Sequence, residues 1–188
     1  MTRHVLAVVL ALGCLAVHAE TITGRVVGVS DGDTITVLDN SKTQHKVRLA
    51  GIDAPESKQA FGQASKKHLS DLVFGKDVRV EWKKHDRYGR IVGKVMFQPQ
   101  DCSSCQHTRD AGLVQLEAGL AWWYREYRRE QTLEDQGYYE YAEFDAKAQR
   151  RGLWGDADPI PPWEWRKKTQ VVAQLSFFRR MGGSVYGF

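Results

Sequence analysis

Short runs rich in Val, Ile and Thr, separated by polar turns, dominate the first half of the chain. Apolar and polar residues alternate within these runs, as in Ile35/Val37 and Val47/Leu49, and this is the period of a strand with one buried face. The pattern predicts five strands, over residues 21–29, 34–38, 45–50, 77–83 and 91–97.

Three other segments have the apolar spacing of helices. Between the third and fourth predicted strands, apolar residues recur at helical spacing from Phe61 to Val73, and Gly75 ends the run as a helix cap does. A second helix is predicted around Leu113 to Leu120, because leucines recur there at three- and four-residue spacing.

A third helix is predicted from about Thr132 to Arg151. Thr132-x-x-Asp135 has the pattern of a capping box, and Gly152 follows the helix. The residues expected to face the barrel are Leu133, Tyr141, Phe144 and Ala148.

Strands that come first, with helices interleaved and appended, favour an α+β domain. The simplest arrangement is a closed five-stranded β-barrel with about three α-helices, and 188 residues suffice for one such domain. The proline-dense stretch at 156–162 is expected to end the domain, because proline cannot continue a helix. We therefore expect a domain over residues 20–165 and a C-terminal tail, residues 166–188, whose role the sequence does not indicate.

Residues 1–19 have the pattern of a secretory signal peptide, with Arg3 before an apolar run from Val5 to Val17. A membrane anchor is the alternative, but the run is shorter than the roughly 20 residues that span a bilayer. Cys14 leaves a lipoprotein open, although the residues before it are a poor acylation signal. We expect a secreted or periplasmic monomer that starts at Glu20 and has no membrane attachment.

Charge and cysteine content add little that is specific. The formal net charge of +4 falls to +3 when Arg3 leaves with the signal, which agrees with a polyanionic partner but is also common for solubility alone. Cys102 and Cys105, with His107 nearby, could form a local disulfide, bind zinc without an evident fourth ligand, or remain free thiols. Export favours the disulfide.

Two acidic residues are expected to meet at one rim of the barrel. A hairpin paired about residue 41 sets position 33 opposite about position 49, so Asp53 can fold back toward Asp33. Carboxylates are hard oxygen ligands for a divalent cation. The alternative is that Asp31-Gly32-Asp33-Thr34 is an ordinary turn, since Asp and Gly are frequent in turns.

Arg48, Glu56 and Arg90 complete a set suited to the cleavage of a phosphodiester. Arg48 lies between two apolar strand residues, Glu56 follows a proline that restrains its backbone, and Arg90 closes a predicted hairpin turn. Guanidinium groups bind phosphate through paired hydrogen bonds. The alternatives are a surface ion pair between Arg48 and Glu56, and a solvated turn at 86–90.

Aromatic residues offer candidate contacts to bases. Tyr88, in the turn at 86–90, could stack on a base or pack on the barrel edge. A block of Trp, Tyr and Arg spans 122–141, and most of its rings are expected to pack in the core or between helices. Tyr124 is the member expected to contact substrate.

The order and spacing of these motifs resemble the staphylococcal nuclease family. The resemblance covers about residues 20–156 and rests on the clusters at 31–34, 48–56, 86–90 and 119–121. It implies an OB-fold barrel and a Ca²⁺-dependent endonuclease acting on DNA and RNA, with 3'-phosphate and 5'-hydroxyl products. It implies no stable protein partner.

The same resemblance implies a role for each charged residue. Asp33 and Asp53 would bind the metal through carboxylates, and Ala54 through its backbone carbonyl. Glu56 would act as general base or orient the water, and Arg48 and Arg90 would bind the scissile phosphate. The family's best-known member has Thr at the position of Ala54 and a longer loop after Glu56, so substrate contacts from that loop do not carry over.

Two other classes of protein remain open. An OB-fold module that binds nucleic acid without cutting it would be expected to lack some of the five charged residues, and all five are present. A secreted structural or adhesion domain would need the tail or the cysteine loop to carry its function. DNA and RNA are not distinguished, because the arginines address phosphate rather than bases.

Overall fold

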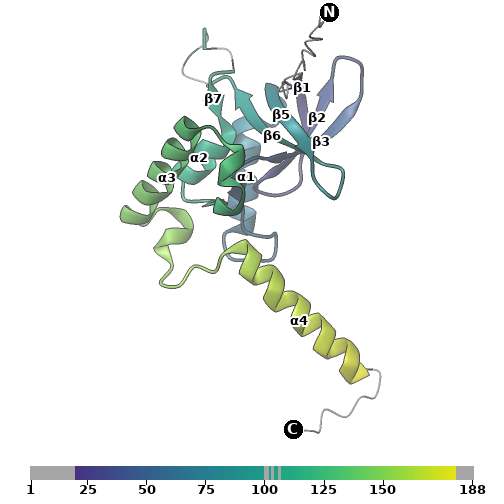
Figure 1. The fold of residues 1–188 in the computed structure, drawn as a ribbon, viewed down its shortest axis with the longest axis vertical. Helices are drawn as coiled ribbons and strands as arrows, with labels where there is room; N and C mark the ends of the chain where they lie inside the picture. The colour runs from purple at the N-terminus through teal and green to yellow at the C-terminus, as the bar shows by residue number, and fades with distance from the viewer. Residues whose placement is uncertain (1–19, 100–101, 103, 106, 181–188) are drawn as a thin grey trace, which may run out of the picture.

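A closed β-barrel with helices on one side forms the body of the protein (Figure 1). The computed structural model describes residues 20–99, 102, 104–105 and 107–180, without the side chains of residues 178 and 179. The predicted signal peptide and Cys14 lie outside the described residues.

The barrel consists of five long strands, β1 (Glu20–Val29), β2 (Thr34–Asp39), β3 (Gln44–Leu49), β5 (Asp77–His85) and β6 (Ile91–Phe97). Their order is β3-β2-β1-β5-β6, and a parallel pairing of β3 with β6 closes the barrel. The other neighbours are antiparallel. The predicted α+β class with a five-stranded barrel is confirmed.

Three strands of two residues each extend this frame. β7 (Arg109–Asp110) pairs with β6, and β4 (Ile52–Asp53) pairs with β8 (Trp122–Trp123). Two-residue strands are too short to show a period in sequence, and they were not predicted. The β4–β8 pair matters for the site because β4 contains Asp53, and its partner strand β8 comes from a distant part of the chain.

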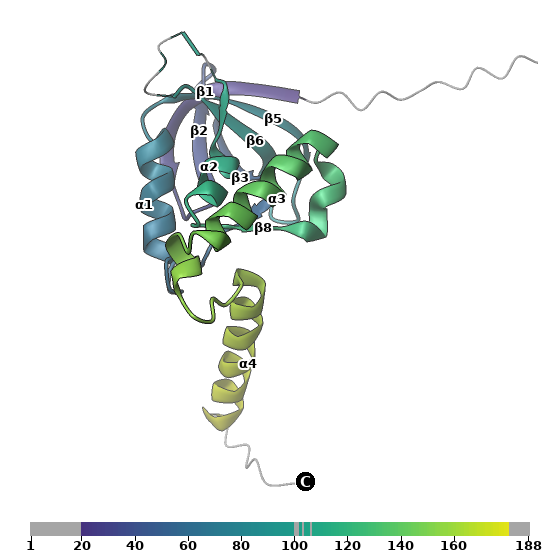
Figure 2. The same cartoon turned by 90° about the vertical axis from the view of Figure 1, so that its left-hand side faces the viewer.

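Helices α1 (Gly62–Val73), α2 (Ala111–Glu117) and α3 (Leu133–Ala148) pack beside the barrel, with α2 in contact with both α1 and α3 (Figure 2). Two 3₁₀ helices, η1 (Arg125–Glu130) and η2 (Gly152–Gly155), flank α3. Inward side chains of the strands and helices form a main core that includes Val37, Val47, Leu49, Leu69, Val80 and Leu116. A smaller cluster consists of Ala146, Leu153 and Trp154.

The predicted start of α3 is confirmed, but its predicted inner face is wrong. The Thr132 hydroxyl accepts a hydrogen bond from the Asp135 N–H at 3.0 Å, as an N-cap does. The residues that were expected to face the barrel are exposed: Leu133, Tyr141, Phe144 and Ala148.

The buried face of α3 instead consists of Tyr139, Ala142, Glu143 and Ala146. Two alanines allow the helix to approach its neighbours closely. Glu143 is buried because the Trp123 N–H donates to it at 3.0 Å and Arg125 pairs with it at 2.8 Å. Glu143 was not among the residues expected on the inner face, and its partners from β8 and η1 explain why it is buried there.

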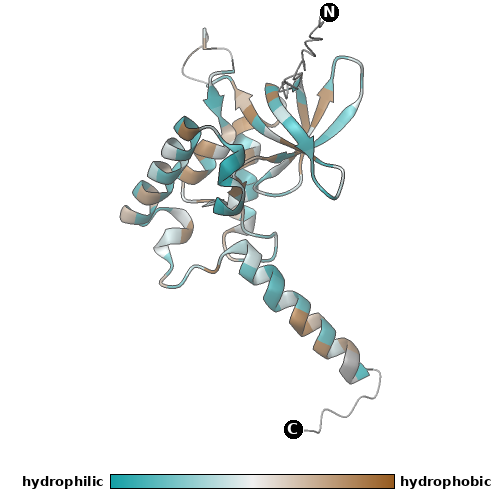
Figure 3. Cartoon of the chain, viewed as in Figure 1, coloured by the Kyte–Doolittle hydropathy of each residue, from teal (hydrophilic) through white to brown (hydrophobic). Residues whose placement is uncertain are grey.

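A fourth long helix, α4 (Pro162–Arg180), extends away from the body (Figures 1 and 2). Proline fits the first turn of a helix, so the proline-dense stretch starts this helix as well as ending the preceding domain. The expected boundary between residues 165 and 166 falls inside α4. Side chains from Lys167 to Phe177 are exposed, and several are apolar (Figure 3). Within the described part of the chain, no helix is both long and apolar enough to cross a membrane.

Two glycines with positive φ give a matched test of the backbone packing beside β8. A methyl group on Gly119 (φ +66°) would fall on the carbonyl oxygen of Arg151, whereas nothing lies within 4 Å of the same position at Gly75 (φ +74°). We expect Gly75→Ala to lower the free energy of unfolding by about 1–2 kcal/mol, the cost of the left-handed conformation. Gly119→Ala should lower it clearly more in urea titrations. Equal losses would contradict this packing.

Candidate active site

The β2–β3 hairpin brings the first acidic residue and the first arginine together. Thr34 pairs with Arg48, and the Leu49 N–H donates to the Asp33 carbonyl at 2.7 Å. The predicted register, with position 33 opposite 49, is confirmed. Since Asp33 directly precedes β2, its side chain starts at the same end of the barrel as that of Arg48.

Asp33 and Asp53 converge on one guanidinium nitrogen. Arg48 Nη2 lies 2.8 Å from Asp53 Oδ1 and 3.3 Å from Asp33 Oδ2. The Ala54 N–H also donates to Asp33 Oδ2, at 3.2 Å. Both acidic residues are buried, at 1% exposed for Asp53 and 6% for Asp33. The segment is therefore more than a solvated turn, and the expected meeting of the two carboxylates is present.

Burial and neighbouring charges shift the pKa values of Asp53 and Arg48. Burial raises the pKa of Asp53, and the hydrogen bond from Arg166 and the charge of Arg48 oppose that rise. Burial alone would lower the pKa of Arg48, but the charges of Asp33 and Asp53 raise it overall. Ionised carboxylates buried side by side thus depend on the guanidinium groups between them.

Asp31 is a further acidic group that the sequence showed only as part of a turn. Its carboxylate accepts a hydrogen bond from the Asp33 N–H at 3.1 Å. Burial and the charge of Asp33 raise the pKa of Asp31 to about 6. This end of the barrel therefore gathers more negative charge than the two predicted ligands supply.

Arg90 reaches the same rim through Thr34. Its Nη1 lies 3.5 Å from Thr34 Oγ1, a long contact, and that hydroxyl donates to Asp33 Oδ1 at 2.8 Å. The Arg90 side chain is held by Asp86, whose Oδ2 lies 2.7 Å from Arg90 Nε. The hairpin turn predicted at 86–90 is confirmed between β5 and β6.

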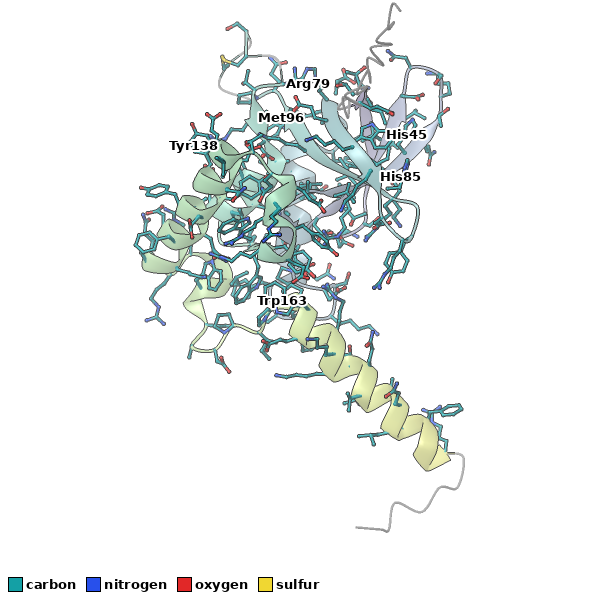
Figure 4. The ribbon with its side chains drawn as sticks, in the orientation of Figure 1. His45, Arg79, His85, Met96, Tyr138 and Trp163 are labelled. Carbon is teal, nitrogen blue, oxygen red and sulfur yellow. A yellow bond between two sulfur atoms is a disulfide. The ribbon has the colours of Figure 1, made fainter. Side chains whose placement is uncertain are left out.

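The two candidate base-stacking residues have different surroundings. Tyr88 is 68% exposed and does not pack on the barrel edge. The guanidinium groups of Arg87 and Arg90 lie 4.9 and 5.5 Å from the centre of its ring. The ring of Tyr124 stacks on Trp163 of α4, with ring centres 5.5 Å apart and planes at 25°. Figure 4 shows Trp163 where α4 meets the body.

Glu56 lies beside the acidic pair, but its partner is Arg166 rather than Arg48. Arg166 Nη1 is 2.8 Å from Glu56 Oε1, and Arg166 Nη2 is 2.7 Å from Asp53 Oδ2. Sequence reasoning missed Arg166, which is 113 residues from Asp53. No local motif surrounds it, so no sequence signal pointed to this contact.

A buried amide supports the loop that carries Asp33. Gln115 Nε2 donates to the Gly32 carbonyl at 2.7 Å and to the Ser65 carbonyl at 3.1 Å. Its Oε1 lies 2.5 Å from His68 Nδ1. Gln115 thus ties α1 and α2 to the acidic loop, a role that its place in an apolar helix did not indicate.

Cys102 and Cys105 are joined by a disulfide in the connection between β6 and β7. This is the favoured expectation of the three that the sequence left open. The alternative zinc site has no support among the described residues, where no group of three or more His, Cys, Asp or Glu side chains is placed to hold a metal ion.

The same finding limits what the acidic end of the barrel offers to a cation. The described side chains do not form a complete cage there, and the carboxylates of Asp33 and Asp53 are two oxygen donors of the type that Ca²⁺ prefers. A cationic group does fit at this place, because the Arg166 guanidinium bridges Asp53 and Glu56. The donor chemistry therefore suits a hard cation whose remaining ligands come from elsewhere.

A closed barrel with acidic and guanidinium groups at one rim defines a protein suited to phosphate esters, and the comparisons identify its family. Residues 46–156 match the family model described as "Staphylococcal nuclease homologue". The chain is 42% identical over 156 residues to an "Uncharacterized endonuclease" of Haemophilus influenzae, covering 83% of this chain and 79% of that protein. It is 40% identical over 168 residues to a "Micrococcal nuclease" of Shigella flexneri, covering 89% and 93%.

The chain belongs to the staphylococcal nuclease family. The predicted resemblance is confirmed, and so is the predicted enzyme class, a hydrolase of the nuclease type. The roles of individual residues in metal and phosphate binding stay predictions.

The support from Gln115 can be tested by removing its hydrogen bonds while keeping its size. We expect Gln115→Leu to lower the free energy of unfolding by about 1–3 kcal/mol, because the buried Gly32 carbonyl would lose its donor. Gln63→Leu, which removes a solvent-exposed hydrogen bond to the Ser57 carbonyl, is the control and should change stability little. A loss at Gln115 no larger than at Gln63 would rule out this role.

Proposed function

We propose that the protein is an exported, Ca²⁺-dependent endonuclease that hydrolyses phosphodiester bonds of DNA and RNA and leaves 3'-phosphate and 5'-hydroxyl ends. The observation that carries the proposal is the convergence of Asp33 and Asp53 on Arg48, with Glu56 and Arg90 at the same rim. Relatives named endonuclease and micrococcal nuclease support the same activity.

In this proposal the cation is held by the carboxylates of Asp33 and Asp53 and by the Ala54 carbonyl. Bound Ca²⁺ supplies positive charge that stabilises the growing negative charge on the phosphate oxygens. Asp33 is held for this task by hydrogen bonds from the Ala54 N–H and the Thr34 hydroxyl. Its oxygens are therefore oriented before any ligand arrives.

The other charged residues act on the ester and on water. Glu56 accepts a proton from the attacking water, whose oxygen bonds to phosphorus as the P–O5' bond breaks, and the departing 5' oxygen takes a proton from solvent. Glu56 is suited to this because its side chain is 39% exposed and can reach solvent. Arg48 and Arg90 bind the equatorial oxygens of the phosphate, where paired N–H donors match its geometry. Asp86 orients Arg90 by accepting from its Nε. Arg90 Nη1 then has a single long contact, to Thr34 Oγ1, which phosphate oxygens would replace.

Tyr88 and Tyr124 are proposed to contact the nucleic acid. The exposed ring of Tyr88 lies beside two guanidinium groups, an arrangement that suits a base next to a backbone phosphate. Tyr124 is near enough to Asp53 for that carboxylate to contribute to the rise in its pKa, after burial as the main cause. Export rests on the signal-like residues 1–19, and we propose a monomer that is secreted or periplasmic.

The proposal predicts cleavage that depends on calcium and on Glu56. Mature protein should nick plasmid DNA with Ca²⁺ and stop when a chelator is added. Glu56→Gln should lower kcat by about 10²–10⁴-fold, because the amide cannot accept the proton. Glu164→Gln, at an exposed position, is the control and should cut normally. Undiminished cleavage by Glu56→Gln would remove the proposed base.

The same assay separates the alternative functions. Binding to DNA without cutting, in a gel-shift measurement, would support a catalytically inactive binding module. Neither binding nor cutting would support a structural domain. The ends of the products are read by primer extension, and extension only after phosphatase treatment is the result expected for 3'-phosphates.

Arg90 gives a second test, with its neighbour in the turn as control. Arg90→Lys should lower kcat by about 10²-fold or more, because an ammonium group cannot hold two phosphate oxygens as a guanidinium does. Arg87→Lys, exposed in the same turn, keeps a positive charge beside Tyr88 and has no assigned role at the scissile phosphate, so it should retain most of the activity. Near-normal kcat for Arg90→Lys on plasmid DNA would show that its assigned role is wrong.

A further inference from the structure

Arg166 occupies the centre of the acidic site, although it belongs to the helix that extends away from the body. Its two terminal nitrogens form three hydrogen bonds: from Nη2 to Asp53 Oδ2 at 2.7 Å, from Nη1 to Asp53 Oδ1 at 3.2 Å, and from Nη1 to Glu56 Oε1 at 2.8 Å. Arg166 thereby bridges the proposed metal ligand and the proposed general base.

This contact satisfies both oxygens of Asp53. Arg48 donates to Oδ1 and Arg166 to Oδ2, and the Asp53 side chain is 1% exposed. Arg48 contacts only Oδ1, so a cation at Asp53 would take Oδ2, which is the oxygen that Arg166 holds, and the charge of Arg166 would repel it. Arg166 and a divalent cation therefore cannot both occupy this place.

Among the described side chains, the ring contacts and hydrogen bonds that attach α4 to the body come from its first turns. Trp163 stacks on Tyr124 and meets Trp122 edge to face, with ring centres 5.5 and 5.7 Å apart. Just before the helix, the Ile160 carbonyl accepts from Gln59 Nε2 at 2.5 Å. From Lys167 to Phe177 the helix is exposed. Release of Arg166 would thus break a few contacts at one end of a helix and leave the barrel core intact.

We propose that Arg166 is an internal cation that closes the active site in the absence of metal, and that Ca²⁺ and Arg166 exclude one another at Asp53 and Glu56. This inference rests on the proposed calcium-dependent function. Binding of the cation displaces Arg166 and frees the Glu56 carboxylate to accept a proton. The same movement withdraws Trp163 from the ring of Tyr124, so the proposed base-stacking surface opens together with the metal site.

Calcium affinity without nucleic acid tests this competition directly. In isothermal titration of the mature chain with CaCl₂, Arg166→Gln should lower the Kd by about tenfold or more, because the competing state that reduces apparent affinity is removed. Lys167→Gln removes the same charge from the adjacent exposed position and should leave the Kd unchanged. An unchanged or higher Kd for Arg166→Gln, or an equal decrease in both variants, would overturn the proposal.

A measurement on the unaltered chain keeps the test independent of how the variant folds. Endoproteinase Lys-C cleaves after Lys167 and Lys168, next to the docked turn, and Ca²⁺ should speed cleavage there severalfold relative to lysines of the barrel strands. No change in this ratio at saturating Ca²⁺ would overturn the proposal. If both variants bind calcium with equal Kd, the proposed role of Arg166 is wrong but the calcium site stands. If neither the unaltered chain nor either variant binds calcium, the proposed calcium site is wrong as well.

Discussion

The burial of two carboxyl groups against one guanidinium group is the interaction on which the rest of the site depends. Asp33 and Asp53 share Arg48 Nη2, and Asp53 is almost completely shielded from water. Like charges in such surroundings repel and are poorly solvated, so they persist only with cations beside them. This requirement explains why arginines from β3 and α4 meet at the place where a metal is proposed to bind.

The barrel supplies the geometry that this interaction needs. The register of β2 against β3 sets Asp33 beside Arg48. Asp53 is held by the pairing of β4 with β8, a strand that is distant in sequence. Gln115 then fixes the loop around Gly32 to α1 and α2. Strand pairing and helix packing therefore position carboxylates more rigidly than a surface loop would, which suits a site that must be ready before substrate binds.

Sequence patterns predicted the parts of this arrangement that depend on local period or short spacing. The five strands, the capped start of α3 and the 33-to-49 pairing all follow from alternation, capping and hairpin register. The inner face of α3 was predicted wrongly, because the burial of Glu143 depends on Trp123 and Arg125. The contact of Arg166 with Asp53 joins residues too far apart for any local pattern, and α4 lacks a continuous apolar face. These features follow from tertiary packing alone.

We propose that one acidic site holds two cations in turn, first the guanidinium of Arg166 and then calcium. Two crystal structures of the mature protein, one from crystals grown with Ca²⁺ and one from crystals grown without it, test this most directly. In the crystal grown with Ca²⁺, we expect a calcium ion coordinated by Asp33 and Asp53, with Arg166 moved away. In the crystal grown without Ca²⁺, we expect Arg166 bound to Asp53 and Glu56. A calcium ion bound at Asp33 and Asp53 while Arg166 keeps both its contacts, or bound only elsewhere, would contradict it.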